Sequence, residues 1–299
     1  MGADVLHLYT EAAHWKTKEG LVRGCACRGT AGVAHMSCLA EQAKILLTEA
    51  EENNLDWAVK NVRWARWHMC SLCEQHYYGV VKCALGWACW KTYVGRPETD
   101  QIRGMAMTQL GNGLYDANHY EDALPVYEAE LATLRRVGTS EDQILVVQSN
   151  LASAYQALGR TAEALGARRD VYAGTLKRWG KEHEDTLTEA GNYAGILVEL
   201  QRFKEAKKFL RKTLPVTQRV LGENDETTLR LRWNYAEALY DDPGATLNDL
   251  REAVTTLEET ERTARRVLGG AHPVTKTTED ELKKSRAKLG ARETPPGSA

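Results

Sequence analysis

The sequence lacks a long hydrophobic run and an excess of charge of either sign. Its most apolar stretch, YYGVVKCALGWACW at residues 77–90, has 14 residues and contains Lys82, so it is too short to cross a bilayer. Lys plus Arg number 39 and Asp plus Glu number 41, and the net charge of −2 lacks the basic signature of a general nucleic-acid binder. We therefore expect no membrane span and no nucleic-acid partner.

Motifs of common enzymes are also missing. The chain has no glycine-rich nucleotide loop of the form G-x-x-x-x-G-K-[ST] or G-x-G-x-x-G, and no Ser/His/Asp or paired-carboxylate arrangement. The first residues, MGADVLHLYT, lack the basic start and apolar run of a signal peptide. We expect a cytoplasmic protein without catalytic residues of its own.

What the sequence does have is uneven. All seven cysteines lie between Cys25 and Cys89, and the rest of the chain has none. Clustered cysteines in a reducing compartment favour metal binding over disulfides.

Beyond the cysteines, the sequence repeats itself. Similar segments start 41, 42 and 42 residues apart, and the units end near Gly138, Gly180, Gly222 and Gly269. In the second unit Leu151, Ala152, Tyr155 and Leu158 recur at helical spacing, and Gly159 breaks the pattern. A second helix is expected over 162–179, ending at Gly180. Each unit is thus predicted to be a helical hairpin.

Small residues recur at equivalent positions of these hairpins, namely Gly111, Ala152, Ala194 and Ala236 in the first helix and Ala123, Ala164 and Ala206 in the second. This pattern resembles the tetratricopeptide repeat (TPR), and the longer period resembles the repeats of kinesin light chains. The resemblance covers residues 104–290 and implies an all-α superhelical solenoid of about four repeats. We expect a zinc-binding and helical region at 1–100, a TPR solenoid at 101–290 and a disordered tail at 291–299.

The same resemblance implies a peptide-binding groove lined by the first helices. Its candidate residues are an amide before the leucine of each first helix, polar residues one turn later and one basic residue: Gln109, Asn112, Asn150, Ser153, Asn192, Asn234 and Arg230. The alternative is that these amides serve helix–helix packing within the solenoid.

The cysteine-rich segment carries a second motif. It contains C-x-C-x7-H-x2-C followed by C-x2-C, formed by Cys25, Cys27, His35, Cys38, Cys70 and Cys73. Cysteine and histidine at such spacings can hold tetrahedral zinc. The motif resembles a RING-CH zinc finger from its third ligand onward. That resemblance implies a complete Zn²⁺ site of Cys25, Cys27, Cys70 and Cys73, and a second, incomplete site with His35 and Cys38.

The second site lacks the upstream cysteine pair of the family, and His7 and His14 have the wrong spacing to replace it. Other interpretations of the cysteines remain open. Cys38 lies in a helical run and could belong to the core. Cys83 and Cys89 are expected as buried thiols, although a MYND finger would use them with Cys70 and Cys73.

The order of finger and repeats resembles a family of RING-CH/TPR proteins from microalgae. It implies an adaptor that binds a peptide or partner helix in its TPR groove and carries a structural zinc site. The alternative is a RING-CH-type ubiquitin ligase, which would bind a ubiquitin-conjugating enzyme and choose substrates with its repeats. A cargo adaptor of the kinesin type is less well matched, because no heptad region precedes the repeats.

Overall fold

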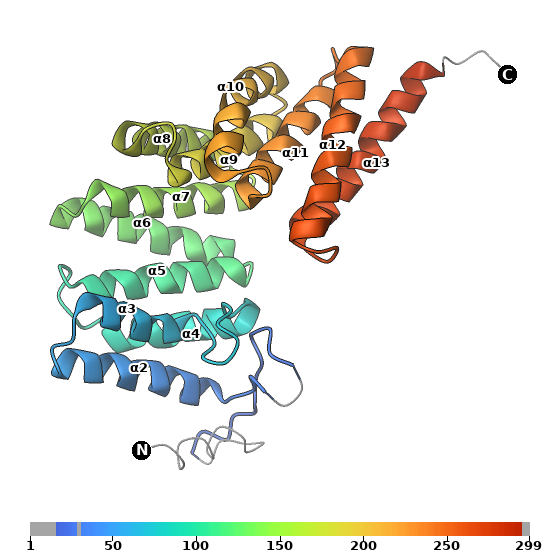
Figure 1. Ribbon diagram of the computed structural model, residues 1–299. Coiled ribbons are helices and arrows are strands. Elements are labelled where there is room, and N and C mark those ends of the chain that lie inside the picture. The colour runs from blue at the N-terminus through green and yellow to red at the C-terminus, as the bar shows by residue number, and fades with distance from the viewer. Residues whose placement is uncertain (1–15, 29–30, 295–299) are drawn as a thin grey trace. The chain divides into compact units, whose positions relative to one another are not determined.

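The structure is a computed structural model that describes residues 16–28 and 31–294. Its regular elements are helices, and the β-structure among the described residues consists of two isolated antiparallel bridges, Val22↔Ala34 and Met69↔His76. Figure 1 labels the elements. Their bounds are α2 Met36–Glu52, α3 Trp57–Trp64, the 3₁₀ helix η1 Ala65–Trp67, α4 Gly79–Tyr93, α5 Gln101–Asp116, α6 Tyr120–Val137, α7 Glu141–Ala157, α8 Thr161–Trp179, α9 Glu184–Glu199, α10 Phe203–Leu221, α11 Glu226–Tyr240, α12 Leu247–Val267 and α13 Pro273–Glu293.

The described residues form two compact units, which divide between Leu158 and Gly159. The division lies inside the second predicted repeat, between its two helices. Residue 100, where a boundary was expected, lies within the first unit. The helices on either side of that residue, α4 and α5, pack directly against each other (Figure 1).

Two glycines allow α4 and α5 to approach this closely. A Cβ at Gly86 of α4 would lie 2.8 Å from the Gln109 carbonyl oxygen, and a Cβ at Gly113 of α5 would lie 2.9 Å from the Lys82 carbonyl oxygen. Each helix thus presents a bare backbone to the backbone of the other. The cysteine-rich front is therefore joined to the first repeat through a tight helix–helix contact.

The predicted helical hairpins are confirmed. The helix α8 runs over Thr161–Trp179, as the spacing predicted, and ends at Gly180. The glycines at the ends of the repeats all have positive φ, which L side chains rarely adopt: Gly138 71°, Gly180 82°, Gly222 90° and Gly269 88°. The periodic glycines therefore mark the helix ends because the backbone conformation there requires them.

The recurring small residues lie where the helices touch. In the first unit a Cβ at Gly111 would lie 2.5 Å from Cε1 of Tyr127, so the tyrosine ring of α6 rests on the bare backbone of α5. In the second unit Ala194, Ala206 and Ala236 are fully buried among leucines such as Leu210. Small side chains thus set the close spacing of the hairpins in each unit.

Within residues 16–28 and 31–294, no helix combines the length and the apolar character needed to cross a bilayer.

Candidate functional site: a four-cysteine cluster and a polar row on the repeats

The cysteine cluster is built from two short turns. The first carries Cys25 and Cys27 and lies between Val22 and Ala34, which pair in an antiparallel bridge. The second carries Cys70 and Cys73 and is closed by the bridge Met69↔His76. Within it the Cys70 N–H donates to the Gln75 carbonyl oxygen at 2.9 Å and the Glu74 N–H donates to the Cys70 carbonyl oxygen at 3.1 Å. The turn is tight, and Glu74 has a left-handed φ of 54°.

These turns bring four sulfur atoms together. The Sγ atoms of Cys25, Cys27, Cys70 and Cys73 all lie within 4.8 Å of one another, and those of Cys27 and Cys70 are 3.8 Å apart. A Zn–S bond of about 2.3 Å implies a spacing of about 3.8 Å between sulfurs of a regular tetrahedron. The arrangement therefore has the size and the donor set of a tetrathiolate metal site.

Backbone N–H groups stabilise negative charge on the sulfur atoms of Cys70 and Cys73. The Leu72 N–H donates to the Cys70 Sγ at 3.4 Å. The Gln75 N–H donates to the Cys73 sulfur and, as the largest influence, lowers the pKa of that thiol to about 7. Burial instead raises the pKa of Cys25. Four neighbouring thiolates repel one another, so full ionisation of the cluster requires a cation among them.

The cluster is anchored to α4 and to the aromatic core of the first unit. Cys25 and Cys70 are buried with Trp67 and Leu85 in one apolar cluster. At the start of α4, the Tyr78 N–H donates to the Gly24 carbonyl oxygen at 2.9 Å and its hydroxyl donates to the Cys25 carbonyl oxygen at 3.3 Å. A metal in the cluster would thus fix the start of the helix that packs on the first repeat.

The other predicted metal ligands form a separate pair. His35 is fully buried, and its Nδ1 lies 3.8 Å from the Sγ of Cys38, which lies in α2. In the described part of the chain, no further His, Cys, Asp or Glu joins this pair to make a cluster of three ligands. His7 and His14 lie outside the described residues.

The remaining cysteines stay away from the cluster. Cys89 is fully buried in the apolar core, and burial raises its pKa. Cys83 is partly buried and packs against another apolar cluster. The set that a MYND finger would use is therefore not brought together, whereas the set that the RING-CH resemblance implies is.

The predicted groove residues of the first unit differ in exposure. Gln109 is buried, and its Nε2 donates to the Trp67 carbonyl oxygen at 3.5 Å. Asn112 is more accessible and accepts a hydrogen bond from the Tyr127 hydroxyl at 2.9 Å. On α7, Asn150 and Ser153 are partly exposed. Gln109 therefore joins α5 to the segment of Trp67 and does not line an open groove.

In the second unit a polar row crosses two successive first helices. Arg230 of α11 donates to the Asn192 Oδ1 of α9 at 3.0 Å, and the Asn192 Nδ2 donates to Glu189 at 3.2 Å. Arg230 and Asn192 are partly exposed, whereas the Glu189 side chain is only 12% exposed and lies 3.8 Å from the Arg168 guanidinium. Asn234, by contrast, is buried and donates to the Gly191 carbonyl oxygen at 3.2 Å, so it joins the two helices.

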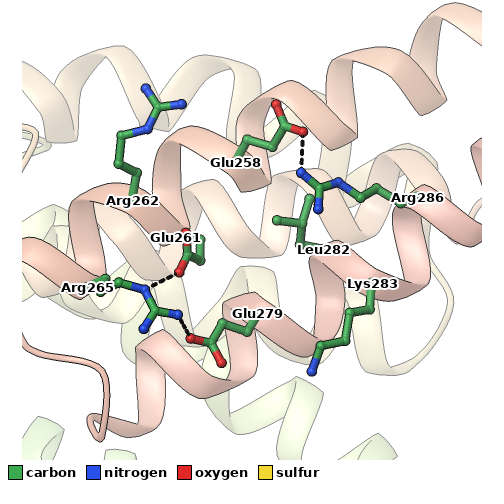
Figure 2. Close-up of a pocket in the computed structure, with 8 residues that line it drawn as sticks. All are labelled: Glu258, Glu261, Arg262, Arg265, Glu279, Leu282, Lys283 and Arg286. Atoms are coloured by element: carbon green, nitrogen blue, oxygen red, sulfur yellow. Dashed lines mark hydrogen bonds and ion pairs between the residues drawn. The ribbon is translucent and has the colours of Figure 1, made fainter.

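A hollow between α12 and α13 is lined by ion pairs (Figure 2). It measures about 590 Å³. Arg286 pairs with Glu258 at 2.6 Å, and Arg265 bridges Glu261 and Glu279. These ion pairs join the two helices, and Arg262 and Lys283, which also line the hollow, lie outside them.

Two acids are buried that the sequence analysis did not single out, Glu130 and Glu281. Glu130 of α6 is only 3% exposed, and the Thr108 hydroxyl donates to one of its carboxyl oxygens. A signal for this burial was present, because Glu130 lies three residues after Tyr127 and seven after Ala123, on the apolar face of the helix.

Comparisons with known proteins agree with this geometry. Residues 186–226, which cover α9 and α10, match the tetratricopeptide repeat family. This segment is a tetratricopeptide repeat. The match does not extend to the cysteine cluster, and no curated protein matches the chain in sequence.

Solved structures with a similar fold include proteins with kinesin light chain-like repeats. A single-substitution variant of a Podosopora anserina kinesin light chain with nearly identical TPR-like repeats is 22% identical and has a TM-score of 0.53, covering 64% of this chain and 88% of that one. The corresponding structure described without a substitution is 19% identical with a TM-score of 0.50, covering 78% and 97%. These likenesses establish an all-α helical repeat fold.

Proposed function

We propose that this chain is a protein–protein interaction scaffold whose repeats bind an extended peptide and whose N-terminal end is fastened by a structural zinc ion. The observation that supports peptide binding is the partly exposed row of Arg230 and Asn192 on α11 and α9. Such a row offers amide and guanidinium donors at successive repeats. A peptide's carbonyl groups could accept from them.

The expected ligand carries an acidic side chain. Arg230 uses one N–H group on Asn192, and a guanidinium has five donors in a planar fork that suits a carboxylate. Asn192 orients the arginine and can itself bond the peptide backbone. Asn112, Asn150 and Ser153 are candidate contacts of the same kind in the first unit.

The zinc proposal rests on the four sulfurs. Cys25, Cys27, Cys70 and Cys73 would hold the ion and so link two turns that are far apart in sequence. Zinc would act there as a cross-link and as the charge that neutralises four thiolates. No specific observation favours the alternative of a ubiquitin ligase, which would need the second site of His35 and Cys38 to be completed.

Peptide selection followed by variant binding tests the scaffold. Peptides selected from a random library against the full chain should bind wild type saturably in fluorescence polarisation. Arg230→Ala should weaken the acidic peptides among them at least tenfold. Arg219 of α10 has the same charge as Arg230 but is exposed and pairs with Glu182, outside the polar row. Arg219→Ala should therefore leave binding unchanged. Equal affinity of both variants and wild type would contradict the proposal.

A further inference from the structure

A cavity of about 620 Å³ lies in the first unit, away from the cysteine cluster. It is enclosed by the start of α5, the end of α6 and the start of α7, together with the segment that leads into α5. Its walls include the apolar side chains of Trp90, Met105, Leu134 and Val147. Cavities of this size and character commonly hold a small ligand or a large side chain.

The polar group of this cavity is Glu130. Its side chain lines the cavity and is only 3% exposed. The Thr108 hydroxyl donates to its Oε1, whereas its Oε2 is buried and accepts no hydrogen bond. Burial raises the pKa of this carboxyl to about 7. A carboxylate left so poorly solvated costs stability, and such costs are concentrated at sites that serve binding.

The acids that line the cavity differ in whether a cation accompanies them. Glu98, Asp100 and Glu130 line it, and Arg103 is the cation among its lining residues. The Arg103 guanidinium lies 3.9 Å from Glu98. The Asp100 carboxylate caps α5 by accepting the Arg103 N–H at 3.1 Å. Arg136 also pairs with Glu98 at 2.7 Å, and Arg96 pairs with Asp100 at 3.5 Å, so Glu130 is the lining acid that has no ion pair in the described part of the chain.

We propose that this cavity binds a primary ammonium group on an alkyl chain, with Glu130 as its acceptor. The ammonium has three donors, of which one would bond Oε2, and its charge would keep Glu130 ionised. The alkyl chain would lie along Met105, Leu134 and Val147. Two sources share this chemistry, a lysine side chain of a partner protein and a free alkylamine.

The test is a titration of the full chain with n-hexylamine, followed by calorimetry at pH 8. Hexylamine should bind saturably, and more tightly than 1-hexanol or hexanoate. Glu130→Gln should weaken hexylamine binding at least tenfold. Glu128→Gln makes the same chemical change at an exposed position of α6 and should leave binding unchanged.

A second variant guards against a folding defect. Gly104→Met would fill the cavity from α5, where a Cβ meets no atom within 4 Å, and leaves the carboxylate in place. It should also abolish hexylamine binding. Spermidine and the peptide acetyl-Ala-Lys-Ala-amide distinguish the sources, since the natural one should bind more tightly. Absence of hexylamine binding, equal binding to Glu130→Gln, or preference for hexanoate would each overturn the proposal.

Discussion

The contact between α4 and α5 gives the sharpest stability prediction. Replacing Gly113 by alanine would place a Cβ 2.9 Å from the Lys82 carbonyl oxygen and 3.0 Å from the Cys83 Cα. Both are backbone atoms of α4, so they cannot rotate away. The two helices must move apart, which loosens the link between the cysteine cluster and the first repeat.

The size of the effect follows from two opposing contributions. Overpacking costs about 1–3 kcal/mol, and a clash with backbone belongs near the upper end of that range. Alanine has a higher helix propensity than glycine, which stabilises the folded unit by about 1 kcal/mol. We expect Gly113→Ala to lower the free energy of unfolding of the first unit by about 2 kcal/mol, or its Tm by roughly 4–8 °C.

The control lies on the same helix. Gly104 of α5 has no atom within 4 Å of an added Cβ, so Gly104→Ala should raise stability by about 1 kcal/mol. Urea unfolding followed by tryptophan fluorescence measures both variants, since residues Trp64, Trp67 and Trp90 report on the first unit. If Gly113→Ala were as stable as Gly104→Ala, the close α4–α5 packing would be refuted.

Three further predictions address single side chains. Cys70→Ser should lower the Tm of the first unit because it removes one of the four sulfurs of the cluster. Cys83 lies outside the cluster, so Cys83→Ser should change the Tm little. Equal Tm values for the two variants in calorimetry would contradict the role of the cluster. The folded pKa of Glu130 is raised from 4.5 to about 7, so the folded state holds its proton more tightly and stability should fall as pH rises from about 4.5 to 7. The fall should reach about 3 kcal/mol, and Glu130→Gln should remove this part of the pH dependence in urea titrations at pH 5 and 8; an unchanged slope would argue against it. Asn234→Ala should destabilise the second unit by about 1–3 kcal/mol because the Gly191 carbonyl oxygen loses its buried donor, and a neutral effect on urea unfolding would rule out a packing role.

The repeats could be predicted from sequence because their signals are local. The spacing of Leu151, Ala152 and Tyr155 reflects a helix, and the glycine at residue 180 reflects a backbone conformation that few other residues tolerate. The ligand set of the cysteine cluster came from the resemblance to a known finger, and the structure places those four sulfurs together.

Features that depend on distant parts of the chain were not predictable in the same way. Gln109 and Asn234 look like the other repeat amides in sequence, but Trp67 and Gly191 supply them with buried carbonyl partners. The division at Leu158 depends on how helices pack, and the spacing of repeats does not encode it. Glu130 could have been recognised by its place on an apolar helix face, but the cavity beside it is formed by residues of α4, α5, α6 and α7 together.

The metal content of the native chain tests the proposed structural site most directly. Elemental analysis of full-length protein purified without added metal should find one zinc per chain, held by Cys25, Cys27, Cys70 and Cys73. The same analysis of Cys70→Ser should find substantially less. A wild-type protein that folds stably without bound metal would contradict the proposed zinc site.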